Sequence, residues 1–128
     1  MTAIDSHVEQ RLCSENNIWI ATVRPDGRPH LTPVWFAWHE GRLYLCIDPG
    51  SVKAKNLAQN RRVALALEDG SSPIIVEGTA RWVEGSDRPQ GAIDEFIRKY
   101  DWNIAADDQY SQLVEVTPNK VLNWSGGG

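Results

Sequence analysis

The chain has 128 residues, of which 41% are hydrophobic, and this length and composition are typical of one globular domain with a single core. Its formal net charge of −4 excludes the basic surplus typical of proteins that bind nucleic acid or an anionic membrane surface. The N-terminal stretch has no secretory signal pattern, and no apolar run is long enough to cross a bilayer. Cys13 and Cys46 are widely spaced, as expected for reduced packing residues. We therefore expect one cytoplasmic domain over residues 1–128.

An amphipathic helix opens the chain, because Ile4, Val8 and Leu12 recur at four-residue spacing. Three segments rich in β-branched and aromatic residues then predict strands, with Pro-Asp-Gly and Glu-Gly as the turns between them. A second, shorter helix is expected after the strand breaker Asp48-Pro49-Gly50. The predicted bounds are 3–14 for the first helix, 18–24, 30–39 and 42–47 for the strands, and 52–59 for the second helix.

The second half of the chain predicts more strands and one long helix. Gly78 lies within a strand pattern and indicates a β-bulge or the close approach of another backbone. Pro89 suits the first turn of the helix, whose apolar positions 93, 96, 97 and 100 share one face. Residues 101–109 are polar and irregular, and Pro118-Asn119 is predicted to be a turn. The predicted strands cover 62–68, 74–84, 110–117 and, as an edge strand, 121–124.

This order of elements favours a mainly β, α+β fold. Several strands at short spacing with a few flanking helices are typical of an antiparallel barrel or sandwich. A Greek-key barrel is the favoured form, because closure removes exposed strand edges.

Two lysines lie at an unusual place in the second predicted helix. Ser51 is predicted to be its N-cap, so Lys53 and Lys55 fall near the N-terminus, where the helix dipole is already positive. Free backbone N–H groups, a serine hydroxyl and ammonium groups together are suited to a phosphate. The alternative is that both lysines are solvated surface charges.

Side chains alone do not predict a catalytic centre. His7, His30 and His39 lack the spacing of metal ligands, and the glycine motifs of serine hydrolases and nucleotide phosphate loops are absent. An enzyme of this sequence would need a cofactor that brings its own reactivity.

A series of short motifs, in consistent order, resembles one known family. They are the strand 18–24, D-G-R-P, P-V-W-F at 33–36, G-R-L-Y-L, S-x-K-x-x-N-L at 51–57 and R-V-A-L at 62–65. Together they resemble the pyridoxamine phosphate oxidase-like superfamily of flavin- and deazaflavin-binding split barrels, over about residues 5–84 and more loosely the closing V-L-N-W. The resemblance implies a homodimer, packed barrel against barrel, with a cofactor in each groove between the subunits.

The resemblance also implies roles for individual positions. Lys53 matches the phosphate-binding lysine, with Ser51 and Asn56 assisting. The other implied cofactor contacts are Thr32, Pro33, Val34 and Trp35 along the isoalloxazine, Ile47 and Asp48 beside the ring and ribityl chain, and Trp124, with Trp82 as a second candidate, from the partner subunit. Trp19 and Trp38 are expected to serve core or dimer packing.

The implied function is an FMN-dependent oxidoreductase that transfers hydride at the flavin N5 to or from a small-molecule substrate. The ending V-L-N-W-S-G-G-G lacks the arginine-bearing segment with which true pyridoxamine phosphate oxidases hold their substrate, so we do not expect vitamin B6 oxidation. The P-V-W-F strand also resembles the deazaflavin-dependent branch, while the acidic composition favours FMN. A non-catalytic flavin carrier, and a barrel without a cofactor, are the remaining alternatives.

Overall fold

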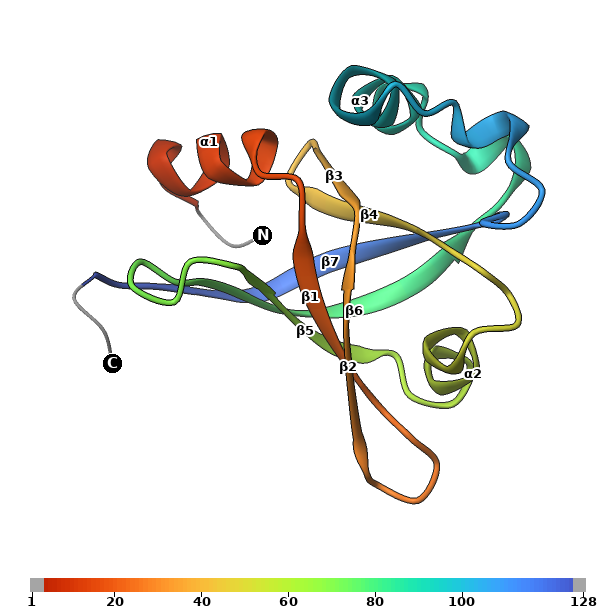
Figure 1. Ribbon diagram of the computed structural model, residues 1–128, viewed down its shortest axis with the longest axis horizontal. Helices are drawn as coiled ribbons and strands as arrows, with labels where there is room; N and C mark the ends of the chain where they lie inside the picture. Colours follow the sequence, from red (N-terminus) through yellow and green to blue (C-terminus); the bar gives the residue numbers. More distant parts are fainter. Residues whose placement is uncertain (1–3, 126–128) are drawn as a thin grey trace.

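A computed structural model describes residues 4–125, in which seven antiparallel strands form one sheet that curls into a half-barrel (Figure 1). The order of the strands across the sheet is β2-β1-β5-β6-β7-β4-β3. The elements are α1 (Ser6–Ser14), β1 (Ile18–Val23), β2 (Pro29–Val34), β3 (Phe36–His39), β4 (Arg42–Ile47), α2 (Val52–Gln59), β5 (Arg62–Leu67), β6 (Ile74–Val83), η1 (Gly85–Asp87), α3 (Gln90–Tyr100), η2 (Ile104–Ala106) and β7 (Gln112–Asn123). The predicted class, an antiparallel split barrel with flanking helices, is confirmed.

The strand predicted over residues 30–39 is in fact two strands, separated at Trp35. β2 pairs with β1, whereas β3 pairs with β4. Because β2 and β3 form the two opposite edges of the sheet, the chain joins these edges covalently but not through a hydrogen-bonded ladder. We call this junction at Trp35 the seam. The sequence around it is continuously apolar and contains no turn signal, so only the choice of partner strands reveals the break.

The predicted turn at Pro118-Asn119 is wrong, since one continuous strand, β7, runs through it. Pro118 lies opposite Gly78, where the register between β6 and β7 shifts. Proline is tolerated at such an irregularity because the ladder there needs no N–H from it. A Cβ built on Gly78 would lie 2.5 Å from the backbone oxygen of Thr117, so the bulge and close approach predicted at Gly78 are both confirmed.

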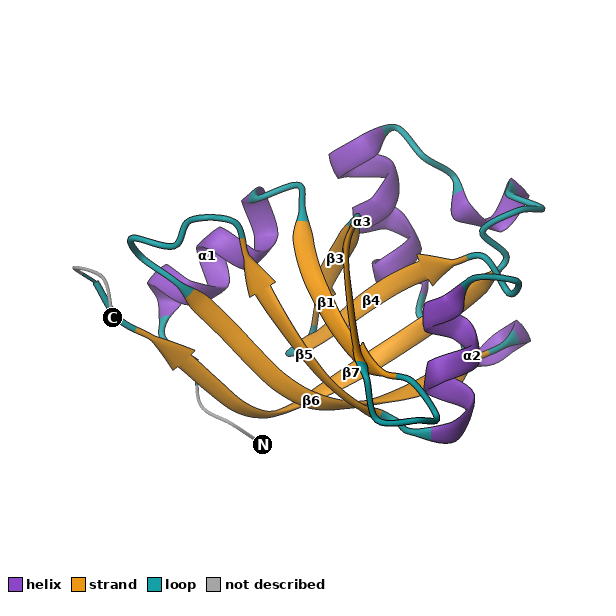
Figure 2. Ribbon diagram, turned by 60° about the horizontal axis from the view of Figure 1, so that its bottom comes forward, coloured by secondary structure: helices purple, strands orange, loops and turns teal. Residues whose placement is uncertain are grey.

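Two hydrophobic clusters fill the barrel and the space below α3. The larger lies inside the curled sheet and includes Phe36, Leu57 and Trp38. The smaller packs α3, through Phe96 and Ala92, against the other face of β4. Figure 2 shows α1 and α2 near opposite ends of the barrel and α3 beside β3 and β4.

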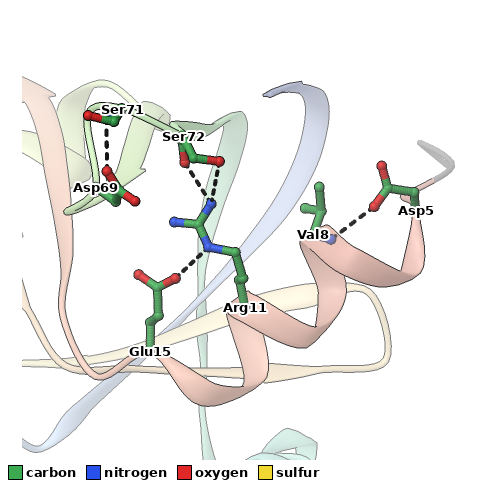
Figure 3. A network of polar contacts seen from close by, with 7 residues as sticks. All are labelled: Asp5, Val8, Arg11, Glu15, Asp69, Ser71 and Ser72. Atoms are coloured by element: carbon green, nitrogen blue, oxygen red, sulfur yellow. Dashed lines mark hydrogen bonds and ion pairs between the residues drawn. The ribbon is translucent and has the colours of Figure 1, made fainter. Parts of the chain in front are cut away.

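Asp5 caps α1, and Arg11 ties this helix to the β5–β6 loop (Figure 3). Asp5 accepts a hydrogen bond from the backbone N–H of Val8 and caps the helix, which therefore begins at Ser6. The guanidinium of Arg11 donates to Glu15 at 2.6 Å and to the backbone oxygen of Ser72, in the β5–β6 loop, at 2.6 Å. The predicted helix 3–14 thus ends correctly but begins too early, and residue 3 lies outside the described residues.

None of the described helices is long and apolar enough to span a membrane.

Candidate functional site

A cavity with a volume of about 700 Å³ lies at the seam. Most of its walls come from the end of β2 with Trp35, the start of α2, and the segment from Tyr100 at the end of α3 to Tyr110, and Asn17 and Cys46 of β4 complete them. α2 and α3 stand apart in both views, with the β2–β3 connection between them (Figures 1 and 2). A cavity of this size is within the range of small-molecule and cofactor sites.

Lys53 supplies the cationic wall of this cavity. Ser51 caps α2 as predicted, accepting from the backbone N–H of Ala54 at 3.2 Å. Lys53 is half-buried, and burial lowers the pKa of its ammonium group below the ordinary value. Within residues 4–125 this ammonium has neither an ion pair nor a hydrogen bond, although Asp48 is close enough to favour its charged form. A half-buried cation without a direct partner is suited to an anionic ligand.

Two unsatisfied polar atoms lie on the inner face of β2. Thr32 and His30 pair with the buried residues Ile20 and Thr22 of β1, so their side chains share the face of Val34, which lines the cavity. Thr32 Oγ1 and His30 Nδ1 are buried and have no hydrogen-bond partner in the described residues. Desolvation, Arg24 and Lys53 lower the pKa of His30, so Lys53 acts on this group. Sequence reasoning included Thr32 but missed His30, although the two-residue period of a strand links them.

Aromatic rings form the wall that faces α2. Trp35 stacks on Tyr100 with ring centroids 4.4 Å apart and planes 4° apart, and Trp102 meets Trp35 edge-on at 5.9 Å. Tyr110 continues this wall, and Cys46 of β4 contributes a thiol whose pKa burial raises to about 12. A thiol with this pKa is neutral at physiological pH and is no nucleophile. Sequence reasoning missed this wall, for which the only signal was aromatic residues in an otherwise polar loop.

The end of α3 satisfies backbone groups that the seam leaves without a strand partner. The Tyr100 hydroxyl accepts from the N–H of Phe36 at 3.1 Å and lies 2.7 Å from the carbonyl oxygen of Asn16, to which it can donate. Lys99 Nζ donates to the carbonyl oxygen of Phe36 at 2.9 Å. These bonds hold the seam, and therefore Trp35, in a fixed position relative to α3.

The structure brings some of the predicted site residues together and separates others. Pro33, Val34, Trp35 and Lys53 line the cavity, and Thr32 lies on the adjoining inner face of β2. Ser51 is engaged as the helix cap, and Asp48 accepts from the backbone N–H of Gly50 at 2.8 Å in the loop before α2.

The remaining predicted residues lie away from the cavity walls. Ile47 is fully buried in the core. Asn56 is also buried and donates to Thr22 Oγ1 at 3.0 Å, which gives it a structural partner. Trp124 follows β7 and is 41% exposed, and Trp82 is partly buried with Arg61 over its ring. The cofactor contacts of all these residues stay predictions.

Part of the outer face of the sheet is apolar. Trp19 and Leu31, which are 37% and 60% exposed, lie on this face with Pro33, since their neighbours Ile18 and Ile20 point inward. The same face continues across the next strands through Ala66, Ile75 and Leu122. Trp38, in contrast, is buried and donates to Glu9, as expected of a core tryptophan.

The family described as "Pyridoxamine 5'-phosphate oxidase" matches residues 4–125, which is nearly the whole chain. The chain belongs to this family. One solved structure of the same fold is the conserved hypothetical protein Rv2991 from Mycobacterium tuberculosis, which is 24% identical to this chain. The match covers 98% of this chain and 86% of that chain, with a TM-score of 0.76. The heme storage protein HutZ from Vibrio cholerae has 16% identity, 98% of both chains covered and a TM-score of 0.76.

A third structure, described as an F420 reductase, has 25% identity, with 93% of this chain and 98% of that chain covered and a TM-score of 0.72. Proteins of this fold thus include one described as a reductase and one described as a heme storage protein. The fold alone therefore does not decide which group this chain binds.

Proposed function

We propose that this chain is an FMN-dependent oxidoreductase that holds its cofactor in the cavity at the seam. The observation that carries the proposal is Lys53, a half-buried cation at a helix N-terminus on the wall of a large cavity, with no ion pair in the described residues. FMN ends in a phosphate, which an ammonium group and a helix N-terminus favour together. When bound, FMN supplies the ability to accept or deliver a hydride.

The residues present fit such a cofactor in three respects. Lys53 and the first free N–H groups of α2 would hold the phosphate. Thr32 Oγ1, buried without a partner, would gain one from a polar edge of the ligand. Pro33, Val34 and Trp35 line the cavity, and their backbone groups would meet the polar edge of a flat ring.

The chain's own residues would bind and orient the cofactor and exclude water from it. The stacked Trp35 and Tyr100 form a rigid apolar wall, because the hydroxyl of Tyr100 is fixed by the seam backbone. Cys46 contributes a neutral, buried thiol. These residues would position the cofactor, and the cofactor would supply the redox chemistry.

The proposal includes a homodimer. The apolar outer face that contains Trp19 and Leu31 would be covered by a second copy. The predicted role of Trp124 depends on this assembly, since Trp124 lies outside the cavity walls of its own subunit.

A deazaflavin-dependent reductase is the second candidate, favoured by the 25% identity to the F420 reductase. A deazaflavin coenzyme would share the phosphate anchor at Lys53 but carry a longer tail. The cavity walls contain Asp101 and Asp107 besides Lys53, and this acidic balance supports FMN.

A binding titration with matched variants tests the anchor. We expect Lys53→Ala to weaken FMN binding by about 1.5–3 kcal/mol, roughly ten- to a hundredfold in Kd, because it removes a charge-assisted bond to the phosphate. Lys55→Ala is the control, since Lys55 is exposed on the same helix and does not line the cavity. The quenching of FMN fluorescence on binding gives the dissociation constant of each variant.

Equal losses in the two variants, or no loss in Lys53→Ala, would place the phosphate elsewhere. The same titration with the deazaflavin coenzyme decides between the two cofactors, because the tighter ligand should be the native one. Reduction of the bound flavin by a nicotinamide donor then separates an enzyme from a non-catalytic carrier.

A further inference from the structure

The end of the cavity away from Lys53 has a different chemistry from the phosphate end. Three aromatic residues line it, Trp35, Trp102 and Tyr110, together with the carboxylates of Asp101 and Asp107. Among residues 4–125, Lys53 on α2 is the only lysine or arginine that lines the cavity. The cavity therefore has a cationic end and an end that is acidic and aromatic.

The rings of Trp35 and Tyr110 each meet the ring of Trp102 edge-on. The planes of Trp35 and Trp102 meet at 72° with centroids 5.9 Å apart, and those of Trp102 and Tyr110 meet at 89° with centroids 6.1 Å apart. Tyr110 is 42% exposed and Trp35 49% exposed, so both rings keep accessible surface. The accessible face of an aromatic ring attracts an alkylated ammonium group electrostatically.

Tyr100 also lines the cavity, but its ring is already engaged. Its ring stacks on Trp35, and Lys99 Nζ already lies 5.2 Å from its centroid. Lys99 itself is turned toward the backbone of Phe36 and away from the cavity walls.

Negative charge is fixed beside the rings. Asp107 accepts from Trp102 Nε1 at 2.9 Å and from the backbone N–H groups of Gln109 and Tyr110, and these bonds hold its pKa below the ordinary value. Its ionised carboxylate thus orients one of the rings and adds electron density to it. Asp101 adds a second, exposed carboxylate with no ion pair in residues 4–125.

We propose that this aromatic and acidic end binds an organic cation, a molecule whose positive charge sits on an alkylated nitrogen. The proposal deepens the proposed function, since such a ligand would be the substrate class that shares the cavity with the cofactor. The attraction comes from ring faces and nearby carboxylates in a partly desolvated site, where both are stronger than in water.

Two ligands test the proposal: choline and 3,3-dimethylbutan-1-ol, its neutral carbon isostere. The two molecules have nearly the same shape and differ in charge. Calorimetric titration of the purified protein, with and without added FMN, should give a preference for choline on the order of tenfold. The neutral isostere reports apolar binding alone.

Two pairs of variants locate the effect. Asp101→Asn should reduce the preference for choline over its isostere severalfold. Asp108→Asn should leave this preference unchanged, because it makes the same charge change in the same loop but lies outside the cavity walls. Tyr110→Leu should reduce it and Tyr110→Phe should retain it, since only the first removes an aromatic face.

Equal binding of choline and its isostere would overturn the proposal, as would equal effects of Asp101→Asn and Asp108→Asn. A failure of FMN to bind, with the choline preference intact, would instead contradict the proposed function and leave the cation site standing.

Discussion

Among single residues, two half-buried lysines differ in the contacts that their ammonium groups make. Lys53 has no ion pair or hydrogen bond among the described residues, and only the more distant Asp48 favours its charge, which is why it is the proposed anchor of a ligand. Lys99 has partners: its Nζ donates to Phe36 O and lies 3.7 Å from the centroid of the Phe36 ring. The first lysine is therefore available for function, and the second supports the seam.

The pKa of Lys99 leads to a prediction about stability and pH. Burial, with a smaller contribution from Arg98, lowers this pKa from 10.5 to about 8. Between these two values the unfolded chain binds more protons than the folded chain, so the free energy of unfolding should rise with pH across this window. Neutral lysine can still donate to Phe36 O, so the bond persists.

Urea unfolding of the wild type and of Lys99→Met from pH 7 to 10.5 measures this effect. The difference in unfolding free energy between them should be flat below about pH 8 and then grow in favour of the wild type. A difference that stays constant across the whole range would show that Lys99 titrates normally.

At the scale of elements, the contact between β6 and β7 depends on one glycine. Gly78 lies where the register shifts, and its missing side chain lets the backbone of Thr117 approach. This contact makes β7 one strand where the sequence predicts two.

Gly78→Ala should therefore destabilise the fold. We expect a loss of about 1–3 kcal/mol in the free energy of unfolding, because the new methyl group would overlap Thr117 O and the Val116 side chain. Gly70→Ala is the control, as a Cβ there meets no atom within 4 Å, and it should change stability by less than about 0.5 kcal/mol. If the two variants had the same midpoint and slope of urea unfolding, the tight contact between Gly78 and the backbone of Thr117 would be contradicted.

At the scale of the whole molecule, the barrel leaves an apolar face on its outside and a cavity at its seam. The two features are connected through β2, whose inner residues Thr32 and Val34 face the cavity side while Leu31 and Pro33 lie on the outer face. A second copy bound to the outer face would lie beside the mouth of the cavity at Pro33.

Leu31→Lys should convert the proposed dimer to a monomer, because it places a charge in the centre of an apolar contact. Light scattering during gel filtration measures the mass of each species. Ile97→Lys is the control, since Ile97 is 42% exposed on α3, away from the outer face. A monomeric wild type, or a dimer that survives Leu31→Lys and not Ile97→Lys, would contradict this interface.

Most of the local structure could be predicted from the amino-acid sequence. The cap at Ser51, the turn at Gly27, the helix over the apolar positions of α3 and the bulge at Gly78 were all predictable, because each depends on residues close together in the chain or on one glycine. The position of Lys53 near a helix start likewise followed from local spacing.

The break between β2 and β3, and the residues that meet there, became visible only in the folded structure. The division of residues 30–39 into β2 and β3 depends on which strands pair with each half, and the aromatic wall from Trp102 to Tyr110 depends on how α3 packs over the seam. Such contacts join residues far apart in sequence, so their free energy is absent from any local pattern. The cationic end of the cavity was therefore predictable from the sequence, and the aromatic, acidic end was not.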